Sequence, residues 1–176
     1  MTSTTSTAVA TALERNVKAV TLRPAVGQGT ATTRVRLRDG LACDITDGTW
    51  SLTAGMAEKY GGINAGPNPG VLGRAAFGAC LALSYAMWAA RLGVALDALD
   101  VEVQADYDVR GELGVSDDTR PGYSQVRYVV SIESAAPAED VMRVLDTADR
   151  YGSWLDNLRN PVDVRREVRI QAPAKD

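Results

Sequence analysis

The longest apolar stretch of the chain is GPNPGVLGRAAFGACLALSYAMWAARLG, which covers residues 66–93. Asn68 is a favourable N-cap residue, Pro69 suits the first helical position, and Gly93 suits a helix C-terminus. The pattern therefore predicts a helix over residues 70–92. Because this segment is apolar on nearly every side, we expect it to be buried in the protein core. Its glycine, serine and arginine residues argue against a membrane-spanning helix.

Strand and helix patterns surround this central helix. Alternating side chains, turn signals and helical spacing predict further elements over residues 19–22, 33–38, 41–45, 49–53, 101–112, 125–133, 138–151 and 162–170. All of them are expected strands except residues 138–151, which have helical spacing. The order predicts an α+β fold with an antiparallel sheet, a long buried central helix and a second helix. We expect residues 1–15 to be a disordered tail and residues 16–176 to form one domain.

Composition excludes several kinds of chemistry. The 176 residues include no histidine, so Ser–His–Asp catalysis, Cys–His catalysis and histidine-ligated metal sites are impossible within the chain. With only Cys43 and Cys80, neither a disulfide framework nor a thiolate zinc site is expected, and we expect no metal and no cofactor. The net charge of −3, without a block of like charges, argues against nucleic acid or an anionic membrane as partner. No secretory signal pattern is seen, so we expect a cytoplasmic location.

Three segments together resemble the OsmC family, which includes the organic hydroperoxide resistance (Ohr) proteins. They are GPNPGVLGRAAFGAC, the later ARLGVALDALDVEVQADYDVRG, and ADRYGSWLDNLRNPVDV. The shared pattern is an Asn-Pro step, a helix that carries a cysteine among small residues, a valine-rich strand and a second Asn-Pro exit. The resemblance extends over residues 32–170. It implies an OsmC-like fold and a compact, intertwined homodimer with the long helices at its centre.

The resemblance also implies an activity. Active members of the family reduce organic hydroperoxides and hydrogen peroxide: one cysteine attacks the peroxide, a second cysteine resolves the sulfenic acid, and an arginine and a glutamate organise the thiolate. Cys80 matches the attacking cysteine. Arg38, which precedes the Asp39-Gly40 turn, matches the arginine, with Arg36 on the same strand face as the reserve candidate. The implied partners are a small hydroperoxide and an external thiol reductant.

Two positions depart from the peroxidase pattern. The family glutamate follows the Asn-Pro step, where this chain has Gly70, and the second cysteine follows an Arg-Tyr-like pair, where this chain has Gly152. These changes are compatible both with a peroxidase that has lost two family groups and with a family member that is not an enzyme. A thiol of ordinary pKa is only about 3% ionised at pH 7, so a reactive cysteine needs a positive neighbour to stabilise its thiolate.

Each candidate residue also has a purely structural interpretation. Free cysteines are often inert core residues, and this applies to both thiols. Cys43 is a substitute resolving thiol only if its Cα lies within about 7 Å of that of Cys80. The strand arginines suit a solvated face as well. Ser84, one turn after Cys80, can bond the sulfur or the carbonyl of the preceding turn.

Four aromatic or long apolar residues are candidate pocket-lining residues, although packing within a dimer core explains them equally well: Phe77, Met87, Tyr151 and Trp154. Three functions are compatible with these features. The first is a cysteine-dependent peroxidase that serves oxidative-stress defence through Cys80. The second is a catalytically degenerate OsmC-like dimer that binds a small apolar ligand. The third is a redox sensor in which the thiol forms a reversible mixed disulfide.

Overall fold

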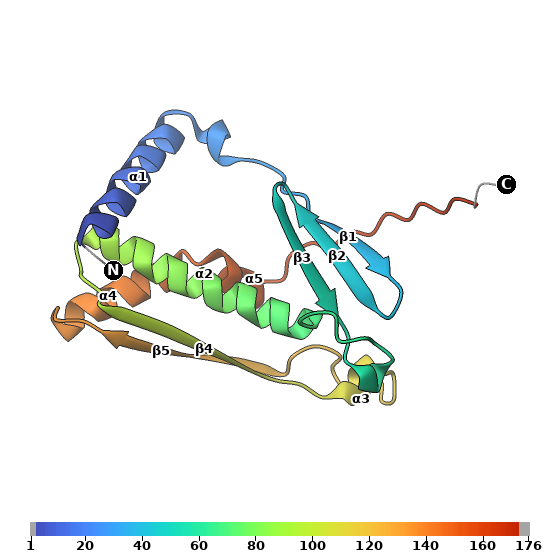
Figure 1. Ribbon diagram of the computed structural model, residues 1–176. Helices are drawn as coiled ribbons and strands as arrows, with labels where there is room; N and C mark the ends of the chain where they lie inside the picture. The colour runs from blue at the N-terminus through green and yellow to red at the C-terminus, as the bar shows by residue number, and fades with distance from the viewer. Residues whose placement is uncertain (1–2, 173–176) are drawn as a thin grey trace.

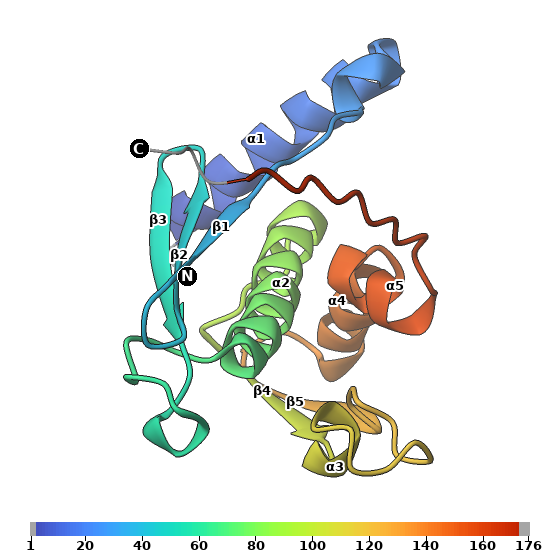
Figure 2. The same cartoon turned by 90° about the vertical axis from the view of Figure 1, so that its right-hand side faces the viewer.

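The computed structural model describes residues 3–172 and is shown in two orientations in Figures 1 and 2. Its α-helices are α1 (Ser3–Leu22), α2 (Pro69–Leu92), α3 (Val109–Glu112), α4 (Ala138–Arg150) and α5 (Ser153–Arg159). Its strands are β1 (Arg34–Arg38), β2 (Ala42–Asp47), β3 (Trp50–Gly55), β4 (Ala98–Asp106) and β5 (Gln125–Glu133). Short 3-10 helices cover Pro24–Gly27 and Glu58–Tyr60. The expected α+β class is confirmed.

The central helix α2 begins and ends at the residues that local chemistry favours. The Asn68 side chain accepts a hydrogen bond of 3.0 Å from the backbone N–H of Val71. Pro69 occupies the first turn, where its missing N–H leaves no hydrogen bond unmade. Gly93 ends the helix in the left-handed conformation, with φ of 70°. The predicted helix is confirmed, one residue longer at its start.

Only one flank of α2 is buried within the chain. The buried positions recur at helical spacing and are Phe77, Leu81, Tyr85, Ala89 and Ala90. This flank packs against β4, α4 and α5, which lie beside α2 in both views (Figures 1 and 2). On the other flank Leu83 is 65% exposed and Met87 is 42% exposed. The prediction of a helix buried on all sides is therefore wrong for a single chain.

The two antiparallel sheets differ in what covers them. In the two-stranded β4–β5 sheet, alternate residues of both strands are half-buried against α2, α4 and α5. In the three-stranded sheet, ordered β1-β2-β3, the register aligns Val35 with Ile45 and Leu52 in one apolar row. Val35 remains 61% exposed and Leu52 56% exposed. This sheet therefore presents an apolar face that the described part of the chain leaves largely open.

The structure corrects the prediction for the N-terminal region. Residues 3–22 form the helix α1 instead of a disordered tail followed by a strand over residues 19–22, while residues 1–2 lie outside the described range. Val9, Leu13 and Val20 lie at helical spacing, and Glu14 precedes Lys18 by one helical turn, a favourable pairing. Helix α1 packs against the C-terminal part of α2 (Figure 1).

Two further expected elements differ. The expected strand over residues 101–112 ends at Asp106, and the short helix α3 follows it. Residues 162–170 run extended but form no strand, because no strand within residues 3–172 pairs with them. Val164 is 89% exposed and Ile170 is 91% exposed along this segment. A strand pattern alone does not make a strand when the partner edge is missing.

Candidate active site around Cys80

Cys80 lies in the middle of α2 on the flank that faces α5. Its side chain is half-buried, and its sulfur lies 3.7 Å from the hydroxyl oxygen of Ser153, a contact in which either atom can donate. Ser153 is the first residue of α5 and follows Gly152, the position that matches the second cysteine of the family. The contact remains open to solvent. The sequence analysis did not find Ser153, because 73 residues separate it from Cys80.

The chain does not bring Arg38 to this thiol. The Arg38 Nε atom forms an ion pair of 3.1 Å with the Asp44 carboxylate on the neighbouring strand β2. The sheet that carries both residues lies across α2 from α4 and α5, as Figure 2 shows. Arg36 is on the same strand and is exposed. Within one chain, both candidate arginines therefore lie away from the face on which the Cys80 sulfur meets α5.

The second thiol lies on this same three-stranded sheet. Cys43 is half-buried on β2, where it pairs with Leu37 on one side and Ala54 on the other. Both cysteines are free. Cys43 thus belongs to the open apolar face of the sheet, whereas Cys80 faces α5. The hypothesis that Cys43 resolves an oxidised Cys80 within one chain gains no support from this arrangement.

The missing glutamate position has a defined environment. A Cβ atom at Gly70 would lie 3.4 Å from a terminal nitrogen of Arg74 and 3.5 Å from the Tyr123 hydroxyl oxygen. Arg74 donates to this hydroxyl at 3.2 Å, and the hydroxyl donates in turn to the Gly70 carbonyl. These residues line a cavity of about 450 Å³ at the N-terminus of α2. Cys80 is not among the residues that line it.

The remaining candidates are spread over different surroundings. Phe77 is buried and packs edge-on against Tyr128, with ring centroids 5.7 Å apart. Tyr151 stacks on Trp88 at 5.4 Å, and Met87 and Trp154 are both partly exposed. Ser84 is half-buried, and the sulfur contact in the described region involves Ser153 instead.

The structure also contains a buried polar network that the sequence did not predict. Tyr85, 1% exposed, donates a hydrogen bond of 2.7 Å to one carboxylate oxygen of Asp149, and Tyr128 donates to the other at 2.7 Å. Burial and the Asp149 carboxylate raise the pKa of both phenols. The network joins α2, β5 and α4. Its residues come from three segments that are distant in the sequence, so no local sequence motif predicts the network.

The described residues contain no group of three or more Cys, Asp or Glu side chains placed to hold a metal ion. The Cys80 sulfur is half-buried and open to solvent beside a hydroxyl group, and within one chain neither candidate arginine lies on this side of α2.

Comparison with known proteins places this fold in a family. The family model described as OsmC-like protein matches residues 61–167, and the chain therefore belongs to the OsmC-like family. No curated protein matches the sequence. Several solved structures share the fold.

An OsmC-like protein from Mycoplasma pneumoniae is 12% identical, with a TM-score of 0.66 over 76% of this chain and 90% of the other. An organic hydroperoxide resistance protein OsmC from Legionella pneumophila is 16% identical, with a TM-score of 0.54 over 78% and 94%. An OsmC-like hydroperoxide resistance protein from a Jannaschia species is 17% identical, with a TM-score of 0.50 over 78% and 90%. These identities establish a shared fold.

Helix α2 is also long and apolar enough to cross a membrane by length and composition alone. Core helices of soluble proteins meet the same criterion. Its buried flank packs on β4, α4 and α5, which is the arrangement of a helix inside an α+β fold.

Proposed function

We propose that this protein reduces organic hydroperoxides through Cys80 in the defence against oxidative stress, as a homodimer in the cytoplasm. Family membership and the hydroperoxide resistance proteins among the structural relatives support this proposal. The observation that carries it is the placement of Cys80: the thiol is accessible to solvent and lies 3.7 Å from a hydroxyl group that can donate to a thiolate.

The proposed reaction needs one cysteine and an external thiol. The Cys80 thiolate attacks the distal peroxide oxygen, the O–O bond breaks, and the leaving alkoxide takes a proton to become an alcohol. Cys80 is then a sulfenic acid, which condenses with one external thiol to form a mixed disulfide and water. A second external thiol attacks the external sulfur of that disulfide, which releases the disulfide of the two external thiols and restores the Cys80 thiol. Ser153, which faces the sulfur, is next to Gly152, the position that matches the resolving cysteine of the family pattern.

Three open surfaces support a homodimer. The outer flank of α2 exposes Leu83, and the β1-β2-β3 sheet leaves its apolar row open. The extended segment 162–170 exposes Val162, Val164, Val168 and Ile170, and no strand in the described part of the chain pairs with it. Exposed apolar patches of this kind mark protein–protein interfaces, and a second copy of the chain offers matching surfaces. We propose that in such a dimer the Arg38 guanidinium of one copy stabilises the Cys80 thiolate of the other copy.

Consumption of an organic hydroperoxide in the presence of dithiothreitol tests the proposed activity. The wild-type protein and Cys43→Ser should turn over the peroxide, whereas Cys80→Ser should not. Equal rates for wild type and Cys80→Ser would contradict the proposal. Mass spectrometry of the peroxide-treated protein should find the sulfenic acid, or its adduct, at Cys80.

Co-expression of two differently tagged variants tests the origin of the arginine. Arg38→Gln and Cys80→Ser homodimers should both be impaired. If Arg38 acts across the interface, their heterodimer contains one intact site and recovers part of the activity. A heterodimer as inactive as its parents would place the arginine in the same chain as its thiol, or outside the site.

A second candidate function is a catalytically degenerate dimer that binds a small molecule or senses redox state. The replacement of the family glutamate by Gly70 and of the second cysteine by Gly152 favours it. Native protein in which a thiol reagent labels Cys80 but hydroperoxide is not consumed would support the sensor. A small apolar ligand retained in native mass spectrometry would support the binding protein.

A further inference from the structure

A second cavity, of about 350 Å³, lies between the start of β5, the loop before it and α5. Its apolar part is built from Phe77, Val126, Tyr128, Leu155 and Leu158. Phe77 and Leu155 are 3% and 5% exposed, and the Phe77 and Tyr128 rings pack edge-to-face at an interplanar angle of 87°. The cavity therefore has a rigid aromatic and aliphatic floor, the lining that small organic ligands prefer.

The charged residues that line this cavity are both cationic. Arg120 and Arg159 line it, and no aspartate or glutamate does, although the Tyr128 hydroxyl donates a hydrogen bond to the Asp149 carboxylate outside the lining. Neither arginine forms an ion pair with another residue of the described range, unlike Arg38, Arg127 and Arg143. Other arginines of the described range, such as Arg36 and Arg150, also form no ion pair, so what distinguishes Arg120 and Arg159 is that both line one cavity. Guanidinium groups bind carboxylates and phosphates through paired hydrogen bonds.

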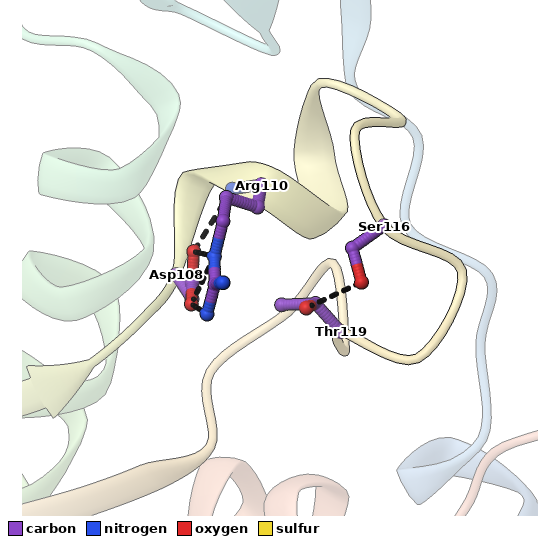
Figure 3. Close-up of polar contacts among 4 residues, drawn as sticks. All are labelled: Asp108, Arg110, Ser116 and Thr119. Carbon is purple, nitrogen blue, oxygen red and sulfur yellow. Dashed lines mark hydrogen bonds and ion pairs between the residues drawn. The ribbon is translucent and has the colours of Figure 1, made fainter.

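The loop that carries Arg120 is held in place by its own contacts. As Figure 3 shows, Asp108 bonds both the backbone N–H and the guanidinium of Arg110 at the start of α3, and Thr119 donates to Ser116 across the loop at 3.0 Å. Gly111 packs so closely on the backbone of Thr119 and Arg120 that a Cβ atom there would clash. These contacts hold the backbone at Arg120 against α3.

The opposite wall of the cavity is equally defined. Arg159 is the last residue of α5, which buried Leu155 anchors to the core. Asn160 donates its backbone N–H to the Asp156 carbonyl and closes the helix end at 2.8 Å. Arg159 also lies near enough to the Tyr128 phenol to oppose, in part, the rise of its pKa that burial and Asp149 cause. Two ordered elements thus direct positive charge at one apolar cavity.

We propose that this cavity binds a small organic anion, a compact apolar group that carries a carboxylate or a phosphate monoester. The apolar group fills the floor formed by Phe77 and Leu155, and Arg120 and Arg159 hold the anionic group at the rim. Neither Cys80 nor Ser153 lines the cavity. Anion binding there therefore does not require the proposed peroxidase reaction.

Isothermal titration of the full-length protein with phenylacetate, phenyl phosphate and neutral phenylacetamide tests the proposal. Either anion should bind at least about tenfold more tightly than the amide, because a hydrogen-bonded charge pair contributes more than a neutral contact. The Arg120→Gln and Arg159→Gln variants should each weaken anion binding about tenfold and leave amide binding unchanged. Tighter binding of phenylacetate than of phenyl phosphate, or the reverse, identifies the preferred anionic group.

Arg143→Gln is the matched control, since it removes the same charge from an exposed side chain on α4 that does not line the cavity. This variant should leave anion affinity unchanged. Cys80→Ser should also bind the anion as wild type does. Thermal unfolding of each variant shows that it is folded. No detectable binding of either anion, equal binding of anion and amide, or an equal loss in the Arg143→Gln control would overturn the proposal.

Discussion

The hydroxyl oxygen of Ser153 lies 3.7 Å from the sulfur of Cys80, and the contact joins the middle of α2 to the start of α5. This hydroxyl stands next to Gly152, where the peroxidase pattern has its second thiol. A hydroxyl can donate to a thiolate but cannot form a disulfide. In the proposed peroxidase reaction, Ser153 therefore has the role of a hydrogen-bond donor to Cys80, and an external thiol resolves the sulfenic acid.

We predict that Ser153→Ala slows alkylation of Cys80 by iodoacetamide at neutral pH by about two- to threefold. The reason is that the Ser153 hydroxyl can donate a hydrogen bond to the attacking sulfur, and this contact is open to solvent, which weakens its effect. Alkylation rates are measured by mass spectrometry of the intact protein. Ser131→Ala, on the exposed face of β5, is the control and should react as wild type does. An unchanged rate in Ser153→Ala would show that the contact does not influence the thiol.

We predict that Tyr85→Phe lowers the free energy of unfolding by about 1–3 kcal/mol, because it removes the hydrogen bond from a buried phenol to the Asp149 carboxylate. Urea denaturation followed by circular dichroism measures the change. Tyr60→Phe alters an exposed tyrosine in the same manner and should have little effect. Equal stabilities for wild type and Tyr85→Phe would indicate that the network is not a stabilising element.

We predict that the Asp108 carboxyl titrates at about 2, well below its ordinary value, in NMR measurements of the folded protein. Hydrogen bonds from the Arg110 side chain and backbone N–H hold its pKa down. Because the folded pKa lies below the unfolded one, this carboxylate stabilises the fold above pH 4 or so, and the contribution is lost as pH falls toward 2.

The Arg110→Gln variant should move the Asp108 pKa upward toward its ordinary value. Arg143 pairs with Asp140 on α4, away from Asp108, so Arg143→Gln should leave the Asp108 titration unchanged. A titration midpoint for Asp108 that is the same in wild type and Arg110→Gln would mean that the guanidinium is not the main cause of the shift.

We predict that Leu83→Asp converts a homodimer into monomers. Leu83 is 65% exposed on the open flank of α2, and a charge buried there at an interface would have no partner. Light scattering coupled to size-exclusion chromatography measures the mass. Val115→Asp, on the loop before β5, changes an equally exposed residue and should leave the mass unaltered. A monomeric wild-type protein, or a dimeric Leu83→Asp, would contradict the prediction.

Local signals were sufficient for the elements whose ends depend on neighbouring residues. Asn68 and Gly93 mark the two ends of α2 because capping and left-handed backbone geometry act within a few residues. Strand β5 was predicted at its observed bounds, since alternation along one strand reports which face is covered. The α+β class followed from the order of such elements, and the family resemblance followed from the motif around Cys80.

Tertiary structure decided the remainder. The sequence by itself determined which residues are able to do chemistry: one family-position thiol, two glycines in place of its usual partners, and no histidine. Only the fold placed Ser153 against Cys80, Arg38 on the far side of α2, and two arginines around one apolar cavity. The physical reason is the sequence separation of the residues involved. Helix caps and strand alternation depend on residues that are near neighbours in the sequence, whereas these contacts join distant segments that meet only when the core packs.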